Sequence, residues 1–233
     1  MTTPTHDAEL VRTATEHLLS ATVKLDPSAI AEPSQLPGWT RGHVLAHLAR
    51  NADALVNVLA GKPMYASAEA RDADIERGAP RTLDDQVDDV RTSASRLESA
   101  FASLGEEDWA RTVTLRNGVT DLASSLPFRR WIEVELHHVD MGIGYKLEDL
   151  PGSFLDRELT NMAGRFLGHP DVPVAVELRA EDGRTWRTGA REAGEEGLLV
   201  VVGGPVALVG WLTGRTTGSG LSASGSLPPL PAL

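Results

Sequence analysis

Residues 129–145 read RRWIEVELHHVDMGIGY, so two glutamates, two adjacent histidines and an aspartate lie within one largely apolar stretch. At roughly 100° per residue, the apolar side chains recur at helical spacing on more than one side of this segment. A helix that is apolar on several sides is normally surrounded by other elements. The stretch therefore predicts a helix, at about residues 122–144, that is buried in a bundle or between two domains.

Three more helices are predicted upstream, over residues 7–26, 40–61 and 83–104, because each segment repeats apolar residues at helical spacing. Thr40 is placed to cap the second of these helices at its amino end. We expect residues 62–80 to form a loop between the second and third helices. Four long helices within about 145 residues are typical of an antiparallel bundle.

The composition changes near LEDLPGSF, residues 147–154. Residues 172–180, 184–189 and 197–204 have the pattern of strands, and Pro205 opens a short helix that ends at Gly214. The tail, residues 218–233, is rich in glycine, serine and proline and is expected to lie irregularly on the surface. The predicted fold class is α+β, with a helical bundle over residues 1–150 and a small α/β domain over residues 151–233.

Composition excludes several classes of partner. A formal net charge of -11 argues against binding to a nucleic-acid backbone, which usually requires a basic face. No stretch approaches the roughly 20 apolar residues of a membrane helix, and the start, MTTPTHDAELVR, lacks the apolar core of a signal peptide. We therefore expect a cytoplasmic protein without a nucleic-acid or membrane partner, and we take a monomer as the default.

The chain contains no cysteine. It has no disulfide, no cysteine ligand for zinc and no thiol nucleophile of its own. Any metal must be held by histidine and carboxylate side chains. Any sulfur chemistry must use a thiol supplied from outside.

Two carboxylate and imidazole pairs within the opening stretch have the spacing of metal ligands. Glu133 and His137 are four residues apart, and Glu135 and His138 are three apart, so each pair shares one side of a helix. Both spacings occur in helical metal sites. Helical periodicity alone does not choose between them.

The helix predicted over residues 40–61 offers a third ligand. Asn51 falls within its apolar stripe and His47 at the edge, whereas His43 lies further round. A buried imidazole without a hydrogen-bond partner costs roughly 1–3 kcal/mol, so an inward-facing histidine needs a partner. His47 is therefore the better candidate for a ligand inside the bundle.

Two imidazoles and one carboxylate with a fourth position left open form a recurrent catalytic zinc site. The same donors also suit Fe²⁺, Ni²⁺ or Mn²⁺. The alternative is a histidine in the core that a neighbouring carboxylate satisfies, beside a solvated charged face. The residues taken alone leave both interpretations open.

Three motifs carry a resemblance to a known family: LPGWTRGHVLAHLARNADAL (36–55), PMYASAEARDADIERGA (63–79) and IEVELHHVDMG (132–142). Together they resemble the mycothiol-dependent maleylpyruvate isomerase family, whose amino-terminal part is a DinB-like metal-binding four-helix bundle. The resemblance recurs at GWLTGRTTGSGLSASG, residues 210–225. It implies a cytoplasmic enzyme of gentisate degradation that converts maleylpyruvate to fumarylpyruvate and uses zinc, or another divalent metal, and mycothiol.

Carried over residue by residue, the metal triad of the family falls on His47, Glu133 and His137. The resemblance leaves three nearby candidates outside the ligand set: His43, Glu135 and His138. Asp140 shares a helix face with Glu133 and His137, and it would either orient His137 or bind a loop.

The functional arginine of the family falls on Arg215, just after the predicted helix end at Gly214. Arg215 would bind a substrate carboxylate, or it would only place a favourable cation at the carboxyl end of a helix. Tyr65 and Arg71 are candidates for cofactor binding, with a structural bridge between the domains as the alternative. Trp39 is expected to pack before the helix cap rather than to contact a ligand.

The resemblance also implies a mechanism. Reversible addition of a thiolate to the alkene of maleylpyruvate permits rotation about the resulting single bond, and mycothiol would supply that thiolate. The metal would lower the pKa of the thiol, while Arg215 would stabilise the enolate and the α/β domain would contribute to the active-site cleft. A mycothiol S-transferase and a non-enzymatic metal- or ligand-binding module are the alternatives.

Overall fold

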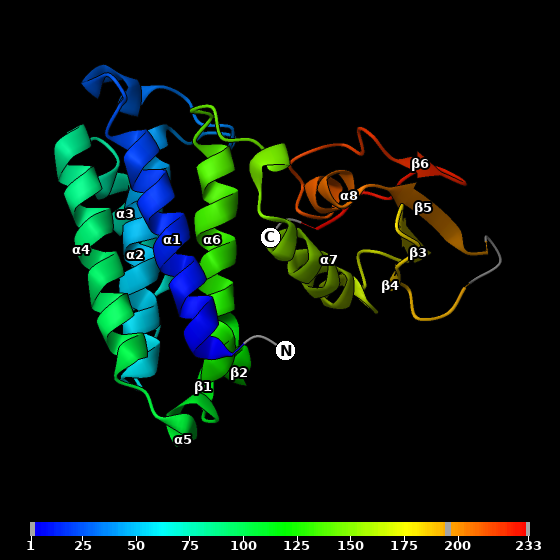
Figure 1. Cartoon of the computed structure of the whole chain (residues 1–233), viewed down its shortest axis with the longest axis horizontal. Coiled ribbons are helices and arrows are strands. Elements are labelled where there is room, and N and C mark those ends of the chain that lie inside the picture. Colours follow the sequence, from blue (N-terminus) through cyan, green and yellow to red (C-terminus); the bar gives the residue numbers. More distant parts are fainter. Residues whose placement is uncertain (1–2, 194–196, 232–233) are drawn as a thin grey trace. The chain divides into compact units, whose positions relative to one another are not determined.

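The computed structural model describes residues 3–193 and 197–231 of the chain. Two compact units, Met1–Lys146 and Leu147–Leu233, follow one another (Figure 1). The first is a helical bundle and the second combines helices with a small sheet. The predicted α+β class, with a bundle before an α/β region, is confirmed.

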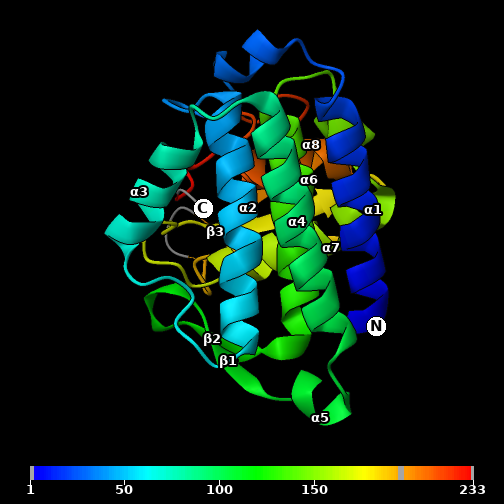
Figure 2. The ribbon, with the colours of Figure 1, turned by 90° about the vertical axis from the view of Figure 1, so that its left-hand side faces the viewer.

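Four long helices form the bundle, as predicted: α1 (Pro4–Thr22), α2 (Arg41–Leu59), α4 (Leu83–Ala102) and α6 (Leu126–Asp140). Both α1 and α2 pack against α4 and against α6. The expectation that neighbours run antiparallel is wrong for two pairs. Helix α2 runs parallel to α4, and α1 runs parallel to α6 (Figure 2).

The segment between α2 and α4 explains why these two helices run parallel. This segment, predicted as a loop, contains the helix α3 (Ala68–Gly78), which carries the chain back to the end where α2 begins. Helix α3 packs closely on α2, because a Cβ atom on Gly42 would lie 2.2 Å from the carbonyl oxygen of Ala79. This contact places α3 beside the amino-terminal half of α2, where His47 lies.

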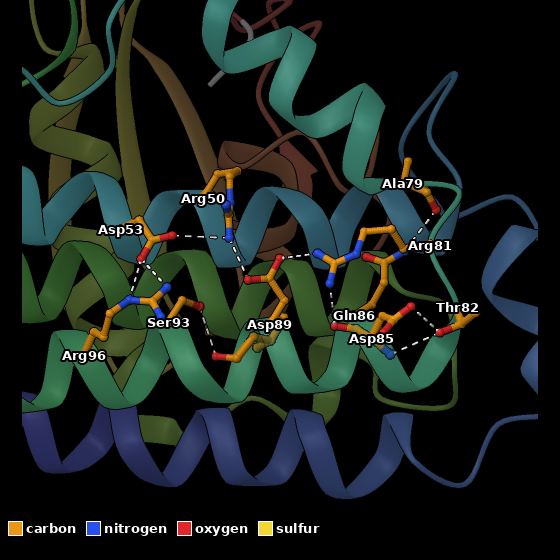
Figure 3. A network of polar contacts seen from close by, with 11 residues as sticks. Arg50, Asp53, Ala79, Arg81, Thr82, Asp85, Gln86, Asp89, Ser93 and Arg96 are labelled. Carbon is orange, nitrogen blue, oxygen red and sulfur yellow. Dashed lines mark hydrogen bonds and ion pairs between the residues drawn. The ribbon is translucent and has the colours of Figure 1, made fainter.

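Ion pairs link α2 and α4 in register (Figure 3). Asp89 accepts hydrogen bonds from Arg50 and Arg81, both at 2.7 Å, and Asp53 accepts one from Arg96 at 2.6 Å. Arg50 pairs with Asp89, and Asp53, further along α2, pairs with Arg96, further along α4. This order is the one expected for parallel helices. Each partly exposed pair contributes at most about 1 kcal/mol, so the apolar core provides most of the stability.

A hairpin not predicted from the sequence closes one end of the bundle. Its strands β1 (Thr112–Thr114) and β2 (Thr120–Leu122) pair antiparallel, after the short helix α5 (Glu106–Trp109). Helix α6 therefore begins at Leu126 rather than near residue 122. The hairpin and α5 add Trp109 and Val113 to a core that includes Phe101 and Leu126.

The second unit contains a mixed sheet with the strand order β4-β3-β5-β6. Its elements are α7 (Gly152–Phe166), β3 (Ala175–Ala180), β4 (Thr185–Gly189), β5 (Leu199–Gly203), α8 (Pro205–Leu212) and β6 (Ser222–Ala223). Strands β3 and β5 are parallel, and the other two pairings are antiparallel. Helix α7 packs on β4 and on α8.

The three longer strands and α8 agree with the prediction. Helix α7 was not predicted, and β6 falls inside the tail that was expected to be irregular. Residues 232 and 233 of that tail lie outside the described residues. Among the described helices, none is both long and apolar enough to cross a membrane.

Candidate active site and metal centre

Three side chains from α2 and α6 converge on one point in the bundle. One ligand atom each from His47, Glu133 and His137 lies within 4.8 Å of the others. The Nε2 atom of His47 is 2.9 Å from Oε2 of Glu133, and Nε2 of His137 is 3.3 Å from the same oxygen. The two imidazole rings are nearly perpendicular, with centroids 4.7 Å apart. The arrangement is compatible with three ligands around one ion.

Helix packing explains how the cluster forms. Glu133 and His137 are one turn apart on α6, and the face that carries them meets α2, which brings His47. The side chain of His47 is 7% exposed, whereas that of Glu133 is 33% exposed. The cluster therefore lies at the edge of the core, buried on the α2 side and accessible beside Glu133.

His43 is not part of the three-residue cluster, as the resemblance to the family implied. Its Nδ1 atom accepts a hydrogen bond from the backbone N–H of Thr40 at 3.1 Å, which completes the capping box of α2. Its Nε2 atom faces Glu76 of α3 at 3.4 Å. His43 is thus turned away from the three-residue cluster.

In both clustered imidazoles Nε2 faces Glu133, and the other nitrogen, Nδ1, has a polar neighbour of its own. Nδ1 of His137 lies 2.8 Å from Oδ2 of Asp140, and Nδ1 of His47 lies 3.2 Å from Nη2 of Arg71. Of the two roles considered for Asp140, its side chain therefore adopts the one that orients His137. The guanidinium of Arg71 lies 5.9 Å from the ring centroid of Tyr65, so α3 and the segment before it reach the cluster.

Mutual interactions shift the pKa values of the cluster. Burial lowers the pKa of His47, which favours its neutral imidazole. Burial alone would raise the pKa of Glu133, but hydrogen bonds from His137 and His47 hold it well below its ordinary range. For His137, burial lowers the pKa, yet the hydrogen bonds to Asp140 and Glu133 outweigh that effect and raise it overall. The site thus favours an added positive charge.

The other polar residues of the opening stretch lie on a separate side of α6. Glu135 accepts hydrogen bonds from Trp131 Nε1 at 3.0 Å and from the hydroxyl of Tyr145 at 2.7 Å. The ring of His138 stacks on Tyr145 with centroids 4.1 Å apart and contacts His17 of α1 edge to face. Neither Glu135 nor His138 joins the three-residue cluster.

Trp39 contacts the cluster from the segment before α2. Its ring lies 5.6 Å from that of His47 and stacks on His43 at 6.1 Å. These contacts agree with the expected packing role before the cap. The indole ring of Trp39 therefore forms an apolar surface beside the imidazole of His47.

Arg130 is a buried polar residue that was not among the site residues predicted from the sequence. It lies three positions before Glu133 and is only 1% exposed. Its Nη1 atom donates hydrogen bonds to the carbonyl oxygen of Leu48 and to Oδ1 of Asn51, both at 2.8 Å. The signal was present, because an arginine on a helix that is apolar on several sides must find buried acceptors.

Arg215 belongs to the second unit, directly after the end of α8. Gly214 has a φ of +74°, and Nη1 of Arg215 donates a hydrogen bond to the carbonyl oxygen of Thr213 at 2.7 Å. The side chain is half-buried. Its position agrees with either role considered for it, a cation at a helix end or a partner for a carboxylate.

The donor chemistry of the cluster fits a divalent metal. Nδ1 of His137 contacts the carboxylate of Asp140, so a neutral ring carries its hydrogen on Nδ1. The lone pair is then on Nε2, the nitrogen that faces Oε2 of Glu133. A carboxylate bonded to the outer nitrogen of a histidine is the usual support of a zinc-bound imidazole. Two nitrogens and one carboxylate oxygen suit Zn²⁺ and several other first-row ions.

Comparisons with known proteins identify the family of the chain. The family model described as mycothiol maleylpyruvate isomerase N-terminal domain matches residues 11–142, and the MDMPI C-terminal domain matches residues 149–232. A crystal structure of a mycothiol-dependent maleylpyruvate isomerase is similar over 100% of both chains, with 28% identity and a TM-score of 0.89. A histidine-to-alanine mutant of a protein with the same description has 27% identity and a TM-score of 0.88, also at full coverage. No curated protein sequence matches the chain.

The fold and the site thus define a two-part enzyme with a helical bundle that carries a candidate metal centre and an α/β unit that follows it. The chain belongs to the mycothiol maleylpyruvate isomerase family.

Proposed function

We propose that this chain catalyses the cis–trans isomerisation of maleylpyruvate to fumarylpyruvate with mycothiol as its thiol cofactor. The observation that carries the proposal is the full-length similarity to the two mycothiol-dependent maleylpyruvate isomerase structures. The absence of cysteine from the chain adds support, since the thiol must come from outside. Neither structure is described as a transferase or a binding protein, so the two alternative functions have no comparable support.

His47, Glu133 and His137 are the proposed metal ligands, with zinc as the first candidate and Fe²⁺, Ni²⁺ or Mn²⁺ as alternatives. The support is the convergence of their ligand atoms within 4.8 Å. When bound, such an ion would supply a positive charge that lowers the pKa of a thiol at the open position. Asp140 would hold the proton on Nδ1 of His137 and so keep Nε2 free to bind the metal.

Arg71 and Tyr65 are proposed to bind the cofactor. An arginine can only donate, so its contact with His47 requires a lone pair on Nδ1 and a hydrogen on Nε2. A metal on Nε2 would move that hydrogen to Nδ1, where Arg71 no longer has an acceptor. The guanidinium of Arg71 would then be released to bind an anionic group near the cluster.

Arg215 is proposed to bind a carboxylate of the substrate and to stabilise the enolate that forms when the alkene accepts the thiolate. A guanidinium presents paired donors that match a carboxylate. The α/β domain over residues 151–233 would in this way complete the active site built on the bundle over residues 1–150.

The test is an assay of the full chain with maleylpyruvate and mycothiol, with the free thiol measured before and after the reaction. We expect fumarylpyruvate to form while the amount of free thiol stays constant. Consumption of the thiol in proportion to product would instead identify a transferase. The metal content and the isomerase activity of the same sample, both measured before and after treatment with a chelator, test the metal requirement.

Three wider expectations stay predictions: a place in gentisate degradation, a cytoplasmic location and a monomeric state. Gentisate-dependent induction, fractionation of cells and sedimentation of the purified chain would test them separately.

A further inference from the structure

Arg130 joins α6 to α2 one helical turn away from the three-residue cluster. Its Nη1 atom donates hydrogen bonds of 2.8 Å to the carbonyl oxygen of Leu48 and to Oδ1 of Asn51, both on α2. Leu48 directly follows His47, and Asn51 lies one turn beyond it. Arg130 itself lies one turn before Glu133 on α6. The contact between His47 and Glu133 and the contacts of Arg130 therefore join the same two helices at successive turns.

A buried arginine is an unfavourable way to fill space in a core. The side chain of Arg130 is 1% exposed, and its Nη2 atom is buried and has no hydrogen-bond partner in the part of the chain that the structure describes. Burial lowers the pKa of Arg130 to about 10, so the guanidinium keeps its charge at neutral pH. Apolar residues that replace buried ionic groups often leave a fold as stable or more stable. Stability alone therefore does not account for an arginine at this position.

The two acceptors on α2 provide another reason for the arginine. An apolar side chain could fill the same volume, but it could not hold two polar atoms of the neighbouring helix. The guanidinium is planar and presents its donors in a fixed geometry, so its bonds restrict both the distance and the rotation of α2 relative to α6. A binding site requires its side chains to be placed within about 0.5 Å. A restraint one turn from the ligand atoms is well placed to achieve this.

We propose that Arg130 is a positioning residue that fixes the spacing of His47 and Glu133 across the interface between α2 and α6. It acts through the two helices and not by contact with an ion. The effect on metal binding rests on the ligands proposed above, whereas the spacing itself is a property of the metal-free chain. The charge of Arg130 repels a bound cation, so its removal alone would strengthen metal binding. A neutral variant that binds metal more weakly therefore reports lost positioning.

Arg130→Met removes both hydrogen bonds and keeps an unbranched side chain in the space. With Co²⁺ as the probe, we expect binding at least about tenfold weaker, as on loss of other groups that orient metal ligands. The absorption spectrum of bound Co²⁺ depends on ligand geometry and should change. Arg130→Lys should recover part of the affinity and of the spectrum, because an ammonium group can still donate to Leu48 or Asn51. Chelator competition measures the affinity, and circular dichroism checks the fold.

The metal-free chain provides a separate measurement of the spacing. The rings of His47 and His137 have centroids 4.7 Å apart, so their ring protons should show a nuclear Overhauser effect in the unmodified chain. Arg130→Met should weaken or abolish this effect. The measurement tests the positioning role even if the unmodified chain binds no metal, a result that would refute only the proposed metal site.

Arg111→Met is the matched control. Nη2 of Arg111 donates a hydrogen bond to the carbonyl oxygen of Leu59 at 2.7 Å, at the carboxyl end of α2. The control thus removes another arginine that is bonded to α2, and it should leave Co²⁺ binding and the nuclear Overhauser effect unchanged. If Arg130→Met does not fold, Asn51→Leu takes its place. It removes one acceptor, retains the charge and should cause a smaller loss of the same kind.

The proposal is overturned if Arg130→Met, or Asn51→Leu in its place, keeps the ring contact, the affinity and the spectrum of the unmodified chain. Tighter binding of Co²⁺ by Arg130→Met would also overturn it, since the charge would then be the main effect of the arginine. Equal losses in Arg111→Met would show a general weakening of α2 and would contradict a specific role for Arg130.

Discussion

Asp140 and His137 are joined by a contact of 2.8 Å between a carboxylate oxygen and Nδ1, one turn apart at the end of α6. Asp140 is 1% exposed, and His137 directs its other nitrogen toward Glu133. The contact fixes which nitrogen of His137 carries a hydrogen and which way the ring faces. Asp140, which is not one of the three proposed ligands, is therefore expected to affect the affinity of the cluster for a metal ion.

Asp140→Asn should weaken metal binding by about 10- to 100-fold, which is the usual effect of removing such a support. Metal affinity is measured by competition with a chromogenic chelator. Glu135→Gln is the matched control, because it neutralises a buried carboxylate on another side of the same helix. Equal losses in both variants would show that the effect of Asp140 is on the helix and not on the ligand.

The affinity for metal should depend on pH through His137, because a protonated imidazole cannot bind an ion. Burial lowers the pKa of His137, but hydrogen bonds to Asp140 and Glu133 raise it overall above its ordinary value of 6.5. Affinity should therefore fall as the pH drops through a midpoint above about 6.5. The stability of the metal-free chain should change in the opposite direction, because protonated His137 stabilises the fold and this contribution is lost as pH rises through the raised pKa.

Asp140→Asn should move that midpoint down, since it removes the largest interaction that raises the pKa. Chelator competition at a series of pH values measures the midpoint in both proteins. An unchanged or higher midpoint in Asp140→Asn would contradict the assignment.

His137→Ala should lose the metal, whereas His138→Ala should retain it. His137 lies in the cluster with His47, while His138 stacks on Tyr145 on another side of the helix. Elemental analysis of the two purified variants measures the bound metal, and circular dichroism checks the fold. Retention by His137→Ala with loss by His138→Ala would mean that the wrong pair had been assigned.

Arg215→Ala should reduce turnover by at least about tenfold and leave the bound metal unchanged, because it removes a charged hydrogen-bond donor to the substrate. Arg187→Ala is the control, since Arg187 is an exposed arginine of the same unit with an ion pair to Glu177. Isomerase rates and metal content are measured on both variants. If Arg215→Ala unfolds or loses metal while Arg187→Ala does not, the role of Arg215 is structural.

Glu158 should make the second unit less stable as the pH rises. It is fully buried in α7, and burial raises its pKa from 4.5 to about 7. Between these values the folded state retains a proton that the unfolded state has lost, so the free energy of unfolding decreases with pH and then levels off above 7. The total change is about 3 kcal/mol at most.

Glu158→Gln should remove that slope, because glutamine does not ionise. Urea unfolding at pH 5 and pH 8, followed by tryptophan fluorescence, compares the two proteins. A slope that persists in the variant would assign the effect to another group.

The long helices of the bundle were predictable because each repeats apolar residues over several turns. Helix α3, the hairpin of β1 and β2, and helix α7 were not. Helix α3 is mostly polar, with only Ile75 buried, so it has no apolar stripe to detect. The strands of the hairpin have three residues each, which is too short for alternation to be recognised.

The sequence by itself determined which side chains of α6 share a face, because helical spacing follows from residue number alone. Only the tertiary structure decided which face meets which neighbour. Glu133 and His137 face α2 and His47, whereas His138 faces His17 of α1. The same holds for Arg71 and Arg130, whose partners lie 24 and 82 residues away on α2. Contacts between distant segments depend on the packing of the whole bundle, and no local pattern encodes them.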